Sequence, residues 1–507
     1  MTAPTPTPAP TPAHTERRPG PTAPHWLREP DRPQLGDSPA RVALVLIAVG
    51  VLVDLALRTR AAGVAAFAAV VVAAIGLSWC GRVRRVGGRV LLAIAVVLAA
   101  CSMVRASPWL LTLDAVAVLV LVAFACSSER GASHLGSTFA GASSRVVATV
   151  GAVVTALPRA LETLASLVPT RDAGVRSHLG SLLRGAVLAL PIVGVLGVVL
   201  ALADPVFASL FRLDVDLAGA GWDVVVVAFT IWVLAGCFVQ AGRPPVERST
   251  ASPSVGVVEG TVVMVGLTAV YAVFALSQWM VARRGADYVL STTGLTYAEY
   301  ARTGFFQLLA AAVLTALVLL WLRSSVAMTS SFSARLFSWL GVLASVLTLV
   351  VVHTALLRLH LYDQAFGLTR LRFFSTAFAW WLGAAFVLVA LAFLVGRRST
   401  REWLPTALGI TAIVMLLLVN AVDPDRLVLA HNLERHASGD GAEFDPWYAV
   451  ELSSDAVPLL VDSVASLDEG DRRVVTNRLC DTYDPTAPVE WNLSSRAAAR
   501  SLEQLCT

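Results

Sequence analysis

Long apolar segments recur along the chain between Arg41 and Asn420, and most approach the ~20 residues that an α-helix needs to cross a bilayer core. Hydrophobic residues make up 56% of the sequence, charged residues 15%, and the mean hydropathy is +0.70. A soluble domain cannot cover so much apolar side chain with polar surface. The sequence therefore predicts an all-α protein, a polytopic transmembrane bundle of about eleven helices.

Apolar runs of this length predict helices whose ends are uncertain by a few residues. The expected helices cover residues 43–57, 61–80, 90–104, 109–126, 185–203, 222–240, 260–281, 297–322, 336–357, 374–395 and 404–420.

The regions outside these helices differ in composition. Residues 1–40 form a Pro/Thr-rich tail that is expected to be disordered. Helices over 41–126 and 185–422 are joined by the linker 127–184, whose middle predicts an amphipathic helix along the membrane surface. Residues 423–507 hold seven arginines against sixteen acidic residues and predict a small helical tail domain.

Several activities lack the residues that they require. The chain contains no lysine, since all 39 of its basic residues are arginine. Phosphate-binding P-loops, protein kinases and Schiff-base enzymes depend on a lysine, so these classes are excluded. Common zinc and nucleophile motifs are also missing from the sequence, and neither a metal nor a cofactor is predicted. The formal charge of +4 is too small to indicate nucleic acid as a partner.

The arginines of short loops predict the orientation, because such residues concentrate on the cytoplasmic side. Two arginine-rich loops are expected on the same side of the membrane as the N-terminus. The loop after the expected helix 185–203 is acidic and lies on the opposite side. The N-terminus is therefore expected in the cytoplasm and the C-terminus outside, in a bacterial plasma membrane. The first arginine-rich loop contains Arg82, Arg84, Arg85 and Arg89, and the second contains Arg397, Arg398 and Arg401. The acidic loop contains Asp204, Asp214, Asp216 and Asp223.

Polar residues gather in four stretches, 203–207, 294–302, 361–372 and 420–435, which this orientation places on the outer side. Asp114 adds an ionisable group inside an apolar helix, where charges are rare and usually have a function. Together these residues suggest a polar, outward-facing cavity. The candidate site consists of Asp114, Asp204, Glu299, Arg302, Tyr362, Asp363, Arg370, Arg372, Asp423, Arg426 and Asn432.

Simpler interpretations of these residues stay open. Thr296 and Glu299 have the spacing of a capping box at a helix start. Arg370 and Arg372 suit either the membrane interface or, with Arg302, a site for an anionic head group or phosphate. Polar residues inside other helices, such as Asp54 with Arg58, His353 and Gln278, are explained equally well by local pairs and hydrogen bonds between helices.

The tail domain contains local signals of its own. Asp445-Pro446 predicts a helix start, Asp455 is a candidate cap for a helix over 456–467, and 494–505 reads as a further helix. Cys480 and Cys506 form a disulfide if the tail lies outside the cell, and otherwise remain free thiols.

Two segments, GLTYAEYARTGFF at 294–306 and LYDQAFGLTRLRFF at 361–374, resemble hallmark segments of an uncharacterised bacterial multi-pass membrane family. This family is catalogued as a domain of unknown function, numbers 4173 and 4153, and the resemblance covers about residues 190–458. Gln307 stands where the family leads us to expect glutamate, which weakens a proton-carrying role there. The resemblance implies a membrane protein and no established activity.

Three function classes therefore remain. The chain transports a small or lipidic solute, or acts as a sensor or accessory protein with an outer ligand and a cytoplasmic protein partner, or is a membrane-embedded lipid or sugar transferase. The lipid bilayer is the expected environment, and an anionic lipid or envelope component is a candidate ligand. The short first outer loop, 58–60, disfavours the transferase, so an enzyme is the less favoured reading.

Overall fold

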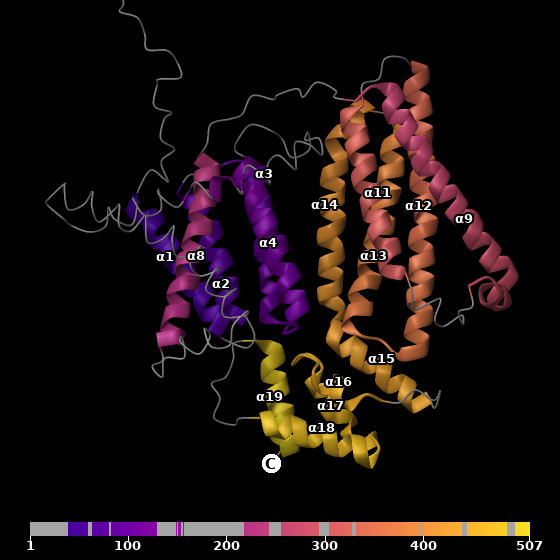
Figure 1. The fold of residues 1–507 in the computed structure, drawn as a ribbon. Helices are drawn as coiled ribbons and strands as arrows, with labels where there is room; N and C mark the ends of the chain where they lie inside the picture. Colours follow the sequence, from indigo (N-terminus) through magenta and orange to yellow (C-terminus); the bar gives the residue numbers. More distant parts are fainter. Residues whose placement is uncertain are drawn as a thin grey trace, which may run out of the picture.

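The computed structural model describes residues 39–58, 63–80, 83–128, 149, 151–153, 156, 217–242, 255–293, 304–326, 331–395, 397–438, 444–483 and 492–506. Across these residues the regular structure is helical, with a single isolated bridge between Val255 and Val326 (Figure 1). The predicted all-α class is confirmed. Each predicted membrane helix overlaps a helix of the structure, except the one at 185–203, which lies outside the described residues.

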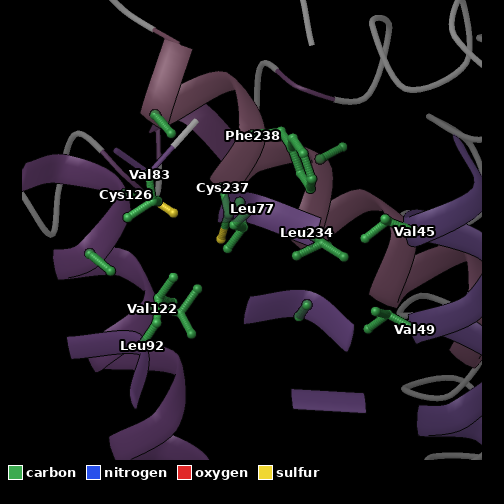
Figure 2. Close-up of a cluster of buried hydrophobic side chains, with 14 of the residues drawn as sticks. Val45, Val49, Leu77, Val83, Leu92, Val122, Cys126, Leu234, Cys237 and Phe238 are labelled. Atoms are coloured by element: carbon green, nitrogen blue, oxygen red, sulfur yellow. The ribbon is translucent and has the colours of Figure 1, made fainter. Parts of the chain in front are cut away.

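The first bundle contains the helices drawn in indigo and the first magenta helix in Figure 1. It consists of α1 (Pro39–Arg58), α2 (Gly63–Trp79), α3 (Val86–Ala100), the 3-10 turn η1 (Cys101–Met103), α4 (Pro108–Ser128) and α8 (Leu217–Gly242). Neighbouring helices pack around a buried apolar core that includes Leu77, Leu234 and Phe238 (Figure 2). The predicted local pair between Asp54 and Arg58 is present at 2.8 Å, and Arg58 also reaches Asp223 of α8.

Part of the linker belongs to this core. Ala152 and Ala156 are fully buried there, and the Trp232 indole N–H of α8 donates to the carbonyl of Val153 at 2.6 Å. These residues pack inside the first bundle. The remainder of the predicted amphipathic helix lies outside the described residues.

The second bundle contains α9 (Val257–Thr293), α11 (Phe305–Ser325), α12 (Ser331–Phe366), α13 (Arg370–Val395) and α14 (Arg397–Val422). Its core includes Leu319, Phe386 and Phe393. The helix expected from residue 297 begins only at Phe305, because Gly304 adopts a left-handed conformation (φ 86°) that an α-helix cannot include.

Eight helices among the described residues are long and apolar enough to cross a membrane, and α2 and the segment 226–242 are shorter apolar helices. Large apolar side chains also cover the outside of the bundles, including Leu44, Val262 and Trp380, each more than 60% exposed. Such a surface suits lipid rather than water. The protein is therefore a multi-pass membrane protein.

The tail domain is a small helical unit at one end of the two bundles (Figure 1). It comprises α15 (Pro424–Ser438), α16 (Pro446–Val450), α17 (Val457–Ser463), the turn η3 (Val464–Ser466), α18 (Glu469–Thr482) and α19 (Leu493–Cys506). Val428, Leu460 and Val475 lie in its core. A disulfide between Cys480 and Cys506 joins α18 to α19, with the Cα atoms 5.5 Å apart.

Two of the three helix starts predicted in the tail are confirmed. Asp445 caps α16 by accepting the N–H of Tyr448 at 3.0 Å, and Pro446 follows at the first helical position. The helix predicted over 494–505 is α19. Asp455, in contrast, does not cap the following helix, because α17 begins after Ala456 without a side-chain cap.

Candidate site at the junction of the tail domain and the two bundles

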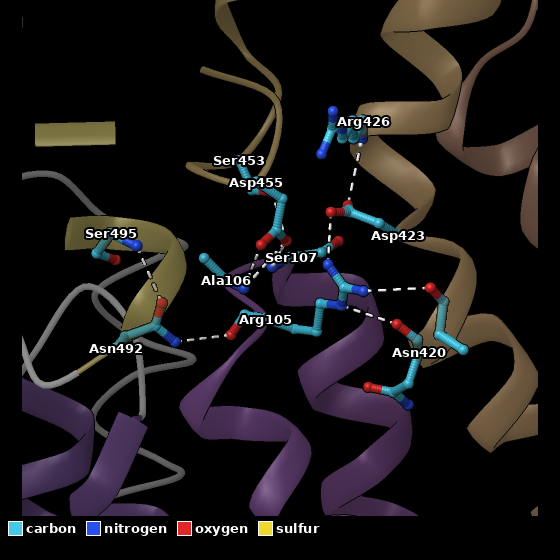
Figure 3. Close-up of polar contacts among 11 residues, drawn as sticks. Arg105, Ala106, Ser107, Asn420, Asp423, Arg426, Ser453, Asp455, Asn492 and Ser495 are labelled. Carbon is cyan, nitrogen blue, oxygen red and sulfur yellow. Dashed lines mark hydrogen bonds and ion pairs between the residues drawn. The ribbon is translucent and has the colours of Figure 1, made fainter. Parts of the chain in front are cut away.

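The tail domain meets the first bundle at the short segment between η1 and α4, and the contacts there are polar (Figure 3). Arg105 lies at the centre of this junction. Its Nε donates to the carbonyl of Asn420 at 2.7 Å, and its Nη1 donates to the carboxylate of Asp423. One arginine of the first bundle therefore binds the end of α14, the last helix of the second bundle.

Asp455 holds the start of α4 instead of the start of α17. Its carboxylate accepts the backbone N–H groups of Ala106 and Ser107 at 3.0–3.1 Å and the hydroxyl of Ser453 at 3.1 Å. Because α4 begins at Pro108, the negative charge also faces the positive end of the helix dipole. The predicted local cap was wrong because the carboxylate finds N–H donors in another part of the chain.

Asn492 makes a second link between the tail domain and the same segment. Its amide nitrogen donates to the carbonyls of Ser102 at 2.8 Å and Arg105 at 2.9 Å. Its side-chain oxygen accepts the N–H of Ser495 at 3.0 Å, as an N-cap residue does at the start of a helix. The residue that begins α19 therefore also fixes α19 to the membrane helices.

Burial and charge perturb Asp423. Desolvation by burial, followed by the negative charge of Asp455, raises the pKa of the Asp423 carboxyl to about 6, while Arg105 acts in the opposite direction. Asp423 has a left-handed backbone (φ 61°) and separates α14, which ends at Val422, from α15, which begins at Pro424.

A buried ion pair joins α13 to α15. Arg370 donates from Nε and Nη2 to the two carboxylate oxygens of Asp425, both at 2.9 Å, and Asp425 is fully buried. The same carboxylate accepts the N–H of Ser453 at 3.0 Å, and the Tyr448 hydroxyl accepts the N–H of Arg370 at 2.8 Å. Burial also raises the pKa of the Tyr448 hydroxyl.

The loop between α12 and α13 is fixed against α15. Asn432 accepts the N–H of Leu368 and donates to its carbonyl, each at 2.9 Å. Gly367 has a left-handed backbone (φ 79°), and a Cβ there would come within 2.8 Å of the Asn432 side-chain oxygen. Only glycine suits both the conformation and the close approach.

Three further predicted site residues lie at this end of α12. The Arg372 guanidinium lies over the ring of Tyr362, 3.8 Å from its centroid, and donates to the carbonyl of Gly367. Asp363 faces His431 of α15, with an oxygen-to-nitrogen distance of 3.5 Å. Both described arginines of the proposed anion cluster, Arg370 and Arg372, therefore have partners within the chain.

The other predicted residues divide into three groups. Arg426 is exposed, and only its backbone N–H contacts Asp423, at 3.4 Å. Asp204, Glu299 and Arg302 lie outside the described residues, as does the predicted capping box. Asp114 of α4 accepts the side-chain amide of Asn420 at 3.0 Å, and the backbone carbonyl of the same Asn420 accepts from Arg105. Whether any of these residues binds a ligand stays a prediction.

Sequence reasoning did not single out Arg105 or Asn492. Arg105 is the one charged residue between two expected membrane helices, and that position is a signal that could have identified it. Asn492 precedes the expected helix 494–505 at a typical N-cap position. Their partners, however, lie more than 300 residues away in sequence and follow no local pattern.

A cleft of about 1850 Å³ lies between the bundles, with α3 and α4 on one side and α11, α13 and α14 on the other. Its walls are almost entirely apolar, as the lining residues Val97, Leu113, Leu314, Phe378 and Ile410 illustrate. None of the described candidate residues lines this cleft, and the polar, outward-facing cavity suggested by the sequence stays a prediction. His353 is exposed on α12, and the Gln278 amide of α9 donates to the hydroxyl of its neighbour Ser277 at 3.4 Å.

The described part of the chain has no group of three or more His, Cys, Asp or Glu residues arranged to hold a metal ion. In comparisons with known proteins, residues 92–463 match the family described as Domain of unknown function (DUF4153). No curated protein and no solved structure matches the chain.

Proposed function

We propose that this membrane protein, which belongs to the DUF4153 family, transports a lipidic solute through the cleft between its two helix bundles. The observation that carries the proposal is the cleft itself, an apolar cavity inside the membrane-spanning part of the molecule. Apolar walls favour a solute with hydrocarbon chains over a small polar solute, because a polar group there would lose its hydrogen bonds to water.

The size of the cleft supports a large solute. Pockets for small molecules usually enclose about 300–1,000 Å³. The cleft has about 1850 Å³. Helices from both bundles line it, so a movement of one bundle relative to the other would change its shape. Movement of this kind is a common basis of alternating access in transporters.

We further propose that the tail domain is extracytoplasmic and that the N-terminus lies in the cytoplasm of a bacterial cell. The helix directions support this orientation. The segment before α3, with Arg84 and Arg85, and the start of α14 at Arg397 lie at one end of the bundles, and the tail domain lies at the other (Figure 1). Arginine-rich loops favour the cytoplasm, and a disulfide favours an oxidising compartment.

A sensor or accessory role is the second candidate. The observation that favours it is that the tail domain contacts the ends of both bundles, so a ligand of the tail domain would act on both. In that case deletion of part of the linker 127–184 would abolish signalling while binding at the tail domain survives. An envelope component outside and a protein partner inside belong to this reading.

Two glycines provide a matched test of transport. Gly409 of α14 lines the cleft, whereas Gly266 lies on α9 away from it, and a Cβ at either position would meet no atom within 4 Å. Gly409→Trp places a large side chain in the cleft, and its Cβ meets no atom of the wall. We expect it to slow the transbilayer movement of a fluorescent phospholipid in proteoliposomes at least several-fold, while Gly266→Trp has the wild-type rate.

The assay measures how fast labelled lipid becomes accessible to a membrane-impermeant quencher. Equal rates for both variants would remove the cleft from the mechanism. A wild-type rate no higher than that of protein-free liposomes would reject lipid transport itself.

A further inference from the structure

Two buried oxygen atoms at the contact between the bundles have no hydrogen-bond donor. Asp114 of α4 and Asn420 of α14 are each only 4% exposed. The Asn420 amide donates to Asp114 Oδ1 and to the carbonyl of Leu416, both at 3.0 Å, which uses both of its protons. Asp114 Oδ2 and Asn420 Oδ1 then remain without a partner among the described residues.

Such a pair is unfavourable when Asp114 is a carboxylate. Both orphaned atoms are acceptors, so neither can satisfy the other, and a buried acceptor without a donor costs about 1–3 kcal/mol. A charge inside a membrane helix adds a further cost unless a partner neutralises it. Within the described part of the chain, Asp114 has no ion-pair partner, because Arg105 is bound to Asn420 and Asp423.

We propose that Asp114 is a proton-binding site at the contact between the two bundles. One proton on Oδ2 supplies the donor that both orphaned oxygens lack. The carboxylic acid and the carboxamide then form a cyclic pair, in which Oδ2–H donates to Asn420 Oδ1 and the Asn420 amide donates to Asp114 Oδ1.

The surroundings of the pair support a proton more than a metal cation. Among the described residues, the thiol of Cys101 in η1 interacts electrostatically with Asp114, and Arg105 and Asp423 lie towards the tail domain. A sodium ion would need about five or six oxygen ligands, as other hard cations do. The described residues offer two free oxygens here. This number is too small for a sodium ion, but it is the number that a bridging proton needs.

The proton would influence how the bundles touch. With Asp114 ionised, its carboxylate faces the oxygen of Asn420 from the other bundle, and the contact between α4 and α14 is weakened. This inference does not depend on which solute, if any, occupies the cleft. The two proposals therefore fail independently.

Infrared spectroscopy of the full-length protein in lipid nanodiscs tests the site directly. A protonated carboxyl has a C=O stretching band that an ionised carboxylate lacks. We expect the wild type to show such a band near neutral pH, and Asp114→Asn, which has the shape of the neutral acid, to lose it. Asp54→Asn is the control, because Asp54 is ion-paired with Arg58, and it should retain the band.

Asp423 is the other carboxyl that needs a control, since burial raises its pKa to about 6. In spectra recorded from about pH 5 to pH 9, Asp423→Asn should retain the band assigned to Asp114 at each pH at which the wild type shows it. Asn420→Leu should shift the band, because the acid proton loses its acceptor, and this variant serves if Asp114→Asn folds poorly.

Identical acid-region spectra for wild type and Asp114→Asn over the whole pH range would overturn the proposal. It would also be overturned if the acid band of Asp114 disappeared when sodium replaced choline as the buffer cation, since the site would then take a metal cation in place of the proton. Persistence of the band in sodium supports the proposal.

Discussion

At the scale of single residues, the junction depends on side chains that satisfy backbone groups far away in the sequence. Asp455 is 5% exposed and holds two N–H groups before α4, and Ser107 beside it is fully buried. Without the carboxylate, these N–H groups would remain buried and unbonded. A substitution of Asp455, which belongs to the tail domain, would therefore destabilise the first bundle.

Asp455→Ala should therefore destabilise the protein by about 2–4 kcal/mol, since each unsatisfied buried donor costs about 1–3 kcal/mol. Equilibrium unfolding in mixed detergent micelles would measure the loss. The exposed residue Asp462 of α17 provides the control, and Asp462→Ala should change the stability by less than about 0.5 kcal/mol. A similar loss in both variants would show that the contacts of Asp455 with α4 are unimportant.

Asp423 should make the stability depend on pH. The folded protein binds a proton on Asp423 with a pKa of about 6, whereas the unfolded chain binds it with the ordinary value of about 3.9. The stability that this proton contributes is complete below the unfolded pKa and is lost as the pH rises through the folded pKa. Stability from this group therefore increases as the pH falls from 7 towards 4.

The comparison with Asp423→Asn isolates this contribution. Asparagine cannot titrate and tolerates the left-handed backbone at this position (φ 61°). Between about pH 7 and pH 5, the unfolding temperature of the wild type should rise relative to that of the variant. Parallel curves for the two proteins would contradict a raised pKa at Asp423.

At the scale of elements, the sequence predicts the membrane helices well because each is a local property. A run of about 20 apolar residues is enough to identify α4 or α13, whatever the rest of the chain does. The start of α11 was placed too early, since its apolar pattern does not reveal that Gly304 is left-handed. The cap at Asp445 was predicted correctly because its partner, Tyr448, is three residues away.

The candidate site was less predictable, because its contacts join distant segments. The sequence indicated that Arg370 and Asp423 matter, and it did not reveal that Asp425 would bind Arg370 or that Arg105 would bind Asp423. Two arginines in a motif are compatible with an anion site or with internal ion pairs. Only the packing of α15 against α13 distinguishes these cases.

The ion pair between α13 and α15 leads to a prediction at this scale. Arg370→Ala leaves the fully buried carboxylate of Asp425 without its cation, which should cost about 3–5 kcal/mol. Arg426, the residue after Asp425, is exposed and provides the control. Arg426→Ala should change the stability by less than about 0.5 kcal/mol. If both substitutions were equally mild in the same unfolding experiment, the pair would not hold α15 in place.

At the scale of the whole molecule, the tail domain joins two bundles that touch each other over a limited area. Between them lies the cleft, and α4 and α14 contact each other beside it. The tail domain continues directly from α14, so it moves with the second bundle. Its contacts with the segment 102–107 connect it to the first bundle, and the junction therefore fixes the relative position of the two bundles.

Removing these contacts should release the first bundle. In the double variant Asp455→Ala, Asn492→Ala, both side-chain links from the tail domain to the segment before α4 are lost, while the ion pair of Arg105 with Asp423 remains. Spin labels on unnatural amino acids at the exposed positions Leu44 of α1 and Val262 of α9 would report the distance between the bundles. We expect a narrow distance distribution in the wild type and a clearly broader one in the double variant.

Arg473→Ala, which removes an exposed ion pair within α18, should leave the distribution narrow. A double variant as narrow as the wild type would mean that the contacts of Arg105 and the packing between α4 and α14 are sufficient to hold the bundles together. The links made by Asp455 and Asn492 would then have no mechanical influence on the cleft.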